Sequence, residues 1–234
     1  MEKRNKNTLA RTLGCSAPCI QFILIATLFV PSFLSIQSLS RSEPPSQSAD
    51  AETIQTAPLA ALPRLPRDLV KIYAIVKANR PDIGDGEVWE MADVIREECI
   101  KHNLDPILVL ALIQVESGFQ FNAVSPMGAR GIMQIMPDVA QGLARESGLR
   151  PQTDTRRFRP EFLDDPLFNI KLGVYYLHDL KKSFRDVSIA LIAYNLGPTE
   201  VRNRLDNNRE FPDEYATTVL STYQRFKKTK PPLF

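Results

Sequence analysis

Residues 105–118 read DPILVLALIQVESG, and this stretch predicts the helix around which the other helices pack. Asp105 is a favourable N-cap residue and Pro106 suits the first helical position, so the start of the helix is well marked. The following residues are apolar except for Gln114 until the last turn, and a helix that is apolar on all sides is normally buried. Gly118 is suited to end the helix, because glycine accepts the left-handed conformation that is common there.

Glu116 lies near the end of this predicted helix. Counting back by three, four and seven positions reaches Ile113, Leu112 and Val109, so the carboxyl group shares an apolar stripe. Burial disfavours the charged form of a carboxyl group and raises its pKa, as a general acid requires. Two interpretations remain from the helix alone: Glu116 is a general acid, or it ends a core helix and turns back into water.

The composition favours one globular domain and excludes several classes of function. A net charge of +2 at pH 7 argues against a nucleic-acid-binding surface. Cys99 is the one cysteine in the predicted domain, whereas Cys15 and Cys19 lie near the N-terminus, so no disulfide framework is expected. His102 and His178 are far apart in the sequence, and no clustering of Cys with His indicates a metal site. We expect both histidines to be structural, with no metal and no cofactor.

The N-terminal region predicts attachment to a membrane. Residues 1–18 are basic, and residues 19–36 form the densest apolar stretch, which as a helix would reach roughly 27 Å of a hydrocarbon core of about 30 Å. The positive flank places the N-terminus in the cytoplasm and the rest of the chain outside it. We favour an uncleaved anchor. The alternative is a cleaved signal peptide and a secreted protein, for which Ser38-Leu39-Ser40 is a weak cleavage site.

Residues 37–66 are rich in Pro, Ser and Ala and predict a tether, and residues 67–234 predict an all-α domain. Helical spacing of apolar residues and helix-start signals mark the expected helices. The first predicted helix begins near Arg67, and the second runs over 85–103 with Asp85 as its cap. Further helices are predicted over 132–145, 166–184 and 187–195, and a last one begins at Pro212. No convincing alternating strand pattern is found.

Several motifs follow one another in a specific order. ESGF at 116–119 is followed by AVS at 123–125 and GARGIMQIMP at 128–137, and then by DDPLFNIKLGVYYLHDL at 164–180 and IALIAYNLGP at 189–198. In this order and spacing the chain resembles the transglycosylase SLT domain of lytic murein transglycosylases, relatives in fold of goose-type lysozyme. The resemblance covers roughly residues 90–226, and ordered motifs are far more specific together than any one alone.

The resemblance implies a lysozyme-like helical fold and a set of site residues. It implies that Glu116 is the catalytic acid and base, that Ser117 assists it or the substrate, and that a sugar-binding groove lies beside them. The implied substrate-binding residues are Ser117, Ser125, Met133, Gln134, Tyr194 and Asn195. Their chemistry fits, since a Gln side chain offers amide donors and an acceptor to sugars and Met offers an adaptable apolar wall.

A single carboxylate suits a particular reaction. Most glycosidases use two carboxylates about 5 to 9.5 Å apart, but no second acid in the motifs stands out beside Glu116. Asp105 is about three helical turns away, and Asp138 is expected to be exposed or to cap a helix. The resemblance implies cleavage between N-acetylmuramic acid and N-acetylglucosamine in peptidoglycan, in which the muramyl C6 hydroxyl closes an anhydro ring and no water is consumed. A hydrolytic muramidase and a non-catalytic peptidoglycan-binding scaffold are the alternatives.

The expected partners are peptidoglycan glycan strands and, through the N-terminal segment, the membrane. An envelope-spanning complex that opens the wall locally is compatible with such an anchored enzyme. Two segments depart from the family pattern: Asp138 stands where Thr is common, and the Arg-rich segment 142–162 matches nothing sharply. Two interpretations of that segment are open, a part that shapes substrate preference and a solvated loop, and we favour the loop.

Overall fold

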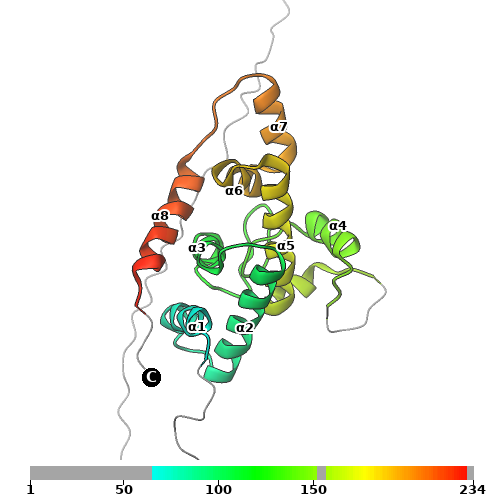
Figure 1. Cartoon of the computed structure of the whole chain (residues 1–234). Coiled ribbons are helices and arrows are strands. Elements are labelled where there is room, and N and C mark those ends of the chain that lie inside the picture. The colour runs from blue at the N-terminus through cyan, green and yellow to red at the C-terminus, as the bar shows by residue number, and fades with distance from the viewer. Residues whose placement is uncertain (1–64, 152–156, 231–234) are drawn as a thin grey trace, which may run out of the picture. The chain divides into compact units, whose positions relative to one another are not determined.

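The computed structural model describes residues 65–151 and 157–230, and the described chain is helical (Figure 1). Its elements are α1 (Arg67–Asn79), α2 (Asp85–Lys101), α3 (Pro106–Ser117), α4 (Pro137–Ser147), the 3-10 helix η2 (Pro160–Asp164), α5 (Pro166–Phe184), α6 (Val187–Leu196), α7 (Pro198–Asp206) and α8 (Glu214–Lys228). Within the described ranges no named strand occurs, and two isolated β-bridges are found. The prediction of an all-α fold is confirmed.

Helix α3 is the centre of the domain, as the sequence predicts. Its middle residues, 108–113, are buried, and α1, α2 and α8 all pack against it. Asp105 caps the helix by accepting a hydrogen bond from the backbone N–H of Ile107 at 2.8 Å. Gly118 ends the helix with φ 58°, in the left-handed region. Both ends of α3 therefore lie where the local sequence predicts them.

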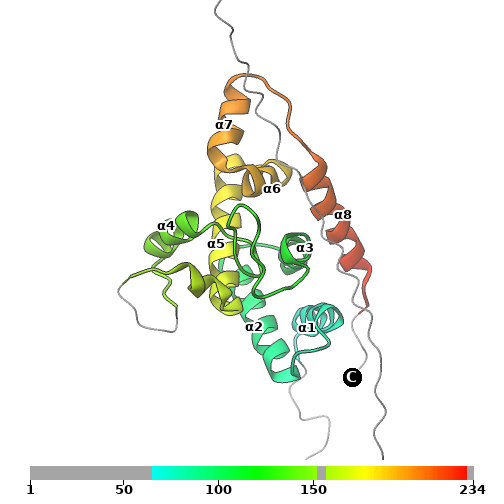
Figure 2. The ribbon, with the colours of Figure 1, turned by 180° about the vertical axis from the view of Figure 1, so that it is seen from behind.

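A second group of helices is built on α5, which packs against α2, α4, α6 and η2. Asp165 caps α5 and Asp186 caps α6, each by accepting hydrogen bonds from backbone N–H groups of the first turn. Helix α6 contacts α7 and α8, and α8 returns alongside α3 after a long connection, as both views show (Figures 1 and 2). The last helix thereby covers the helix that carries Glu116.

The predicted helix over 132–145 is wrong at its start, because α4 begins only at Pro137. Gly131 and Gln134 have φ values of 80° and 49°, which a right-handed helix cannot contain. The segment instead turns back on itself, and Arg130 forms backbone bridges with both Val124 and Ile135. The bridges shape a compact irregular loop between α3 and α4.

Asp85 does not cap α2. The cap position is Gly84, and the Asp85 carboxylate pairs with Lys77 at 2.9 Å across the connection between α1 and α2. The last helix begins at Glu214 rather than at Pro212. Asp213 is its N-cap residue, but the Asp213 side chain accepts no capping hydrogen bond. These shifts at helix ends leave the helix order unchanged.

The predicted N-terminal parts, residues 1–18, residues 19–36 and all but the end of the tether at 37–66, lie outside the described residues, as do residues 152–156 of the Arg-rich segment. Among the helices that are described, none has the length and apolar character needed to span a membrane. The anchor therefore stays a prediction.

Candidate functional site

Glu116 stands in the last turn of α3 and meets a residue from the far end of the chain. The hydroxyl group of Tyr215, in the first turn of α8, donates a hydrogen bond to Glu116 Oε1. Burial raises the pKa of the Glu116 carboxyl to about 7, and the Tyr215 hydrogen bond acts in the opposite direction because it favours the charged form. The group can therefore both give and take a proton near neutral pH.

Tyr215 is one of the residues of this site that the sequence alone does not predict. It lies near the start of the last helix, and no local signal in the sequence connects it with Glu116. Burial and the nearby charge of Glu116 raise the pKa of its phenol well above the ordinary value of 10.0. Tyr215 therefore stays protonated and acts as a permanent hydrogen-bond donor.

Ser117 ties the end of α3 to the loop that follows. Its Oγ donates a hydrogen bond to the carbonyl of Ile132 at 2.6 Å. The residue next to Glu116 is therefore bound to the motif at 128–137. Gln134 stabilises the same loop, because its Nε2 donates to the carbonyls of Ala123 and Gly131, each at 2.9 Å. Among the described residues no donor to its Oε1 is found, so this oxygen can accept a further hydrogen bond. Ser117 and Gln134 are thus brought into one structural unit with Glu116.

Asn169, on α5, fixes this loop by hydrogen bonds to its backbone. The sequence alone does not predict this residue either. It is fully buried, its Oδ1 accepts from the backbone N–H of Met133 at 2.8 Å, and its Nδ2 donates to the carbonyls of Arg130 at 3.0 Å and Leu163 at 2.9 Å. Every strong hydrogen-bonding group of the amide is used, as a buried polar side chain requires. Position 169 lies inside the quoted motif, but its role depends on contacts between distant segments.

Met133 and Tyr194 belong to the core rather than to an open wall. Met133 is fully buried, and its sulfur fills the space above Gly173, where an added Cβ would lie 2.4 Å from it. This position corrects the expectation that the Met133 side chain lines a groove. The buried Tyr194 donates a hydrogen bond from its hydroxyl group to the Met133 carbonyl at 2.9 Å, and the charge of Glu116 contributes to its raised pKa.

The remaining predicted site residues lie at the surface of the loop and of α6. Ser125 closes a tight turn, since its Oγ accepts from the backbone N–H of Ala129 at 3.0 Å. Asn195 is exposed near the end of α6. A further pair that the sequence analysis did not single out fixes this region: the Arg130 guanidinium forms two hydrogen bonds to Asp164, at 3.1 and 2.6 Å.

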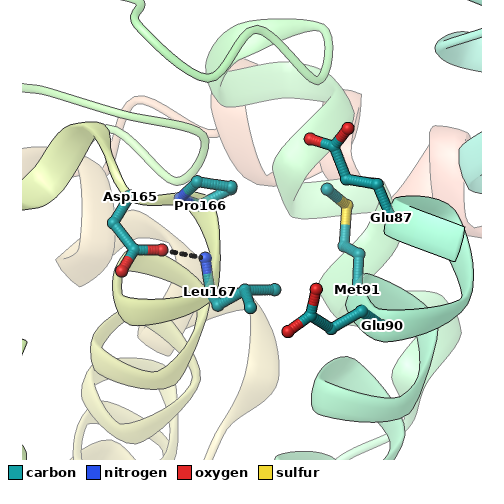
Figure 3. A pocket seen from close by; sticks show the side chains of 6 residues that line it. All are labelled: Glu87, Glu90, Met91, Asp165, Pro166 and Leu167. Carbon is teal, nitrogen blue, oxygen red and sulfur yellow. Dashed lines mark hydrogen bonds between the residues drawn. The ribbon is translucent and has the colours of Figure 1, made fainter. Parts of the chain in front are cut away.

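A pocket of about 310 Å³ lies elsewhere, between α2 and α5 (Figure 3). Its lining residues are Glu87, Glu90, Met91, Asp165, Pro166 and Leu167, so Glu116 is not part of it. The Asp165 carboxylate is occupied in capping α5.

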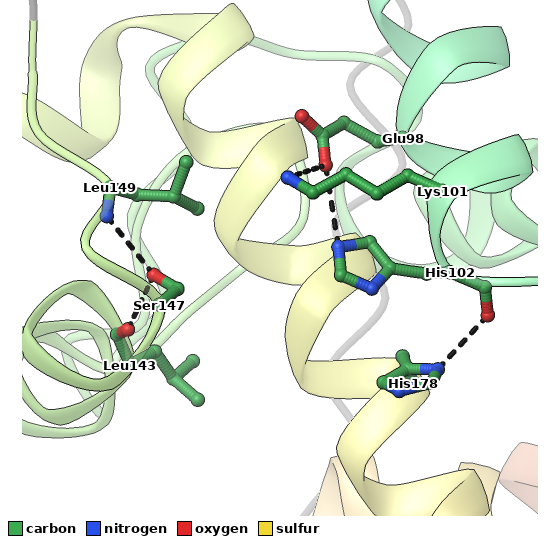
Figure 4. Close-up of polar contacts among 7 residues, drawn as sticks. All are labelled: Glu98, Lys101, His102, Leu143, Ser147, Leu149 and His178. Carbon is green, nitrogen blue, oxygen red and sulfur yellow. Dashed lines mark hydrogen bonds and ion pairs between the residues drawn. The ribbon is translucent and has the colours of Figure 1, made fainter.

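The two histidines that are distant in sequence meet between α2 and α5 (Figure 4). His178 Nδ1 lies 2.9 Å from the carbonyl of His102, and His102 Nε2 lies 3.4 Å from the carboxylate of the buried Glu98, which also pairs with Lys101. Nothing in residues 65–151 and 157–230 groups three or more His, Cys, Asp or Glu side chains for a metal ion. The cluster joins two helices.

His102 is expected to make stability fall at acid pH. Burial, helped by His178 and Lys101, lowers its pKa from the ordinary 6.5, so the unfolded chain binds this proton more readily than the folded protein. The folded state keeps its full stability above pH 6.5 and loses part of it as the pH falls toward the lower folded pKa. In His102→Gln the melting temperature should fall less between pH 7 and pH 5 than it does in the parent protein. Parallel curves of melting temperature against pH for the parent and the variant would contradict this role of His102.

Tyr215→Phe is expected to shift the pH dependence of activity. Loss of the donated hydrogen bond removes the one contact that lowers the pKa of Glu116, so that pKa should rise above about 7. The alkaline limb of kcat/KM, which reports the pKa of the acid in the free protein, should move to higher pH. An unchanged limb, or one moved to lower pH, would show that Tyr215 does not act on Glu116.

Comparisons with known proteins identify relatives in sequence. Membrane-bound lytic murein transglycosylase C of Haemophilus influenzae is 32% identical over 126 residues, covering 50% of this chain and 34% of that protein. The protein of the same name from Mannheimia succiniciproducens is 29% identical over 140 residues, covering 56% of this chain and 37% of that protein. The chain thus matches about a third of the length of these curated relatives.

The fold is shared with solved structures. The 70 kDa soluble lytic transglycosylase of Escherichia coli superposes with a TM-score of 0.52 and 23% identity, over 69% of this chain and 30% of that chain. The predicted lysozyme-like helical fold is thereby confirmed. The transglycosylase SLT domain matches residues 93–217, which include every predicted site residue. The chain therefore belongs to the transglycosylase SLT domain family.

Proposed function

We propose that the protein is a lytic transglycosylase that cleaves the bond between N-acetylmuramic acid and N-acetylglucosamine in peptidoglycan without consuming water. The observation that carries the proposal is the half-buried carboxyl group of Glu116 at the end of α3, which accepts the Tyr215 hydrogen bond and whose pKa of about 7 suits both halves of an acid and base cycle. Membership of the SLT family and the names of the curated relatives support the same reaction.

Glu116 acts twice in the proposed reaction. Its protonated carboxyl first donates to the glycosidic oxygen as the bond to the muramyl C1 breaks. The carboxylate then removes the proton of the muramyl C6 hydroxyl, whose oxygen bonds to C1 and closes the anhydro ring. Because Tyr215 donates to Oε1 in both states, we assign the transferred proton to Oε2.

The surroundings of Glu116 support a nucleophile that comes from the substrate. Asp105 lies at the opposite end of α3, about 16 Å away by helical rise, where it caps the helix and accepts a hydrogen bond from Tyr223 at 2.6 Å. Asp138 is exposed in the first turn of α4. Burial and the Tyr215 bond account for the pKa of Glu116, with no contribution from another carboxylate of the described residues.

We propose distinct roles for the predicted binding residues. Gln134 Oε1 and the exposed Asn195 amide are suited to hydroxyl and N-acetyl groups of the sugars. Ser117 and Tyr194 hold the loop and the end of α3 in place through the carbonyls of Ile132 and Met133. Ser125 shapes the turn at the edge of the site and can meet the glycan strand.

Mass spectrometry of the products from purified peptidoglycan tests the proposal. The full chain should release fragments with anhydromuramyl ends. Reducing muramyl ends, one water heavier, would instead establish a hydrolytic muramidase. Retention on the peptidoglycan without any product would indicate a non-catalytic binding scaffold.

We also propose that residues 19–36 anchor the protein in the cytoplasmic membrane with the helical domain exported. The apolar stretch and its basic flank support this topology, and the curated relatives are named membrane-bound. Recovery of the full-length chain in the membrane fraction would agree, whereas a shortened soluble form would indicate signal cleavage. The expected envelope-spanning complex stays a prediction.

A further inference from the structure

The backbone directly after Glu116 adopts an unusual conformation. Gly118 has φ 58° and Phe119 has φ 66°, so two successive residues lie in the left-handed region. This region suits glycine but is strained for a residue such as Phe, and it persists only where the surrounding structure holds it. Phe119 is fully buried, and its conformation therefore needs partners that fix the backbone.

Arg80 supplies such a partner from the connection between α1 and α2. Its Nη1 donates a hydrogen bond to the carbonyl of Phe119 at 2.9 Å, and its guanidinium lies 4.1 Å from the centre of the Phe121 ring. One side chain thus holds both the backbone and a side chain of the segment that follows Gly118. The contact joins positions 39 residues apart in the sequence.

Asp82 orients the guanidinium for this contact. Arg80 Nε and Nη2 donate to the two carboxylate oxygens of Asp82 at 2.9 and 2.8 Å, which leaves Nη1 directed at Phe119. Arg80 lowers the pKa of Asp82 to about 2, so the pair stays charged throughout the neutral range. A planar guanidinium can satisfy these contacts together, whereas a lysine ammonium cannot.

Arg80 and Asp82 lie outside residues 93–217, the part that matches the SLT domain. We propose that Arg80 is a positioning residue, which acts through the Phe119 carbonyl to fix the end of α3 and thereby the place of the Glu116 carboxyl. The inference rests on the proposed function, since it concerns the same acid. It assigns to the first two helices a role in the site beyond packing against α3.

Arg80→Met tests the proposal, because it keeps the length and apolar stem of the side chain but removes its donors. We expect kcat to fall about ten- to hundredfold with a small change in KM, as for a misplaced catalytic group. A ¹³C NMR titration of the Glu116 carboxyl, assigned with Glu116→Gln and made without substrate, should move from near 7 toward the ordinary 4.5 as water enters.

The titration reports geometry rather than lost charge. The groups that face Glu116 are Tyr215 from α8 and Tyr194 from α6, and the charge of Arg80 is not among the causes of the raised pKa. The titration also needs no turnover. If the proposed function is wrong, Glu116→Gln keeps full activity. This result is distinguishable from a failure of the positioning role, which is measured by the titration of Arg80→Met.

Arg96→Met is the matched control. Arg96 Nε pairs with Asp68 at 2.7 Å between α1 and α2, without a contact to residues 118–121, so kcat and the titration midpoint should stay at the parent values. Arg80→Lys should restore part of the loss. A folded Arg80→Met with parent kcat and midpoint would overturn the proposal. If Arg80→Met does not fold, parent values for both quantities in Arg80→Lys would overturn it.

Discussion

Glu116→Gln is expected to lower the turnover of peptidoglycan by about 10²- to 10⁴-fold, the range that proton transfer by one positioned group contributes. If the same group acts first as acid and then as base, the loss of turnover should reach or exceed the upper end of this range. Gln keeps the shape of the side chain and an oxygen that can accept from Tyr215, so the site geometry should persist. Release of soluble fragments, measured as initial rates, gives the comparison.

The same substitution should raise stability at alkaline pH. The folded pKa of Glu116, about 7, exceeds its ordinary value of 4.5, so the folded protein loses stability as the pH rises between these values. Removing the ionisable group should recover up to about 3 kcal/mol in the free energy of unfolding above pH 7. An inactive variant that is also more stable cannot be explained by misfolding.

Glu98→Gln provides a control at a buried carboxylate outside the site. Glu98 on α2 pairs with Lys101 and with His102, the residue after that helix, whereas Glu116 on α3 is hydrogen-bonded to Tyr215. Its replacement should leave turnover within about twofold of the parent value, since the change lies outside the site. Equal losses in both variants, or full activity in Glu116→Gln, would remove Glu116 from the reaction.

Gly131→Ala is expected to have the largest effect on stability. Gly131 has φ 80°, and a Cβ at this position would lie 2.1 Å from both the Asn169 amide nitrogen and the Leu163 carbonyl oxygen. Backbone strain and the displacement of Asn169 should together lower the free energy of unfolding by about 3 kcal/mol or more. Urea unfolding followed by circular dichroism gives the value.

Gly128→Ala separates the two causes. Gly128 also has a left-handed conformation, with φ 89°, but an added Cβ would meet nothing within 4 Å. We therefore expect only the conformational cost, about 1–2 kcal/mol. Equal destabilisation at both positions would mean that the packing of Asn169 against Gly131 contributes little.

The sequence predicts the fold well where the signals are local. Helix α3 could be placed because Asp105, Pro106 and Gly118 mark its ends and its residues are apolar on all sides. The predicted helices over 166–184 and 187–195 also start where α5 and α6 start, directly after the capping residues Asp165 and Asp186. The segment before Pro137 was misassigned, because apolar spacing suggested a helix while the left-handed backbone at Gln134 prevents one.

The site could be predicted only in part. Glu116 was identified by its place on a buried helix and by its motif, but Tyr215, its hydrogen-bond donor, lies 99 residues further along the chain. Asn169 and Arg80 likewise act through contacts with distant backbone groups, which helical spacing does not reveal. Met133 was expected at a sugar-binding surface, since its motif does not show that Gly173 opens a core space for its sulfur.

The ¹³C titration of the Glu116 carboxyl in the unliganded full chain tests the central claim most directly, because the proposed reaction requires a protonated acid near neutral pH. We expect a midpoint close to 7, set by burial against the Tyr215 hydrogen bond, and a higher midpoint in Tyr215→Phe. A parent midpoint near 4.5 would show a carboxylate in contact with water, and Glu116 could then not serve as the acid.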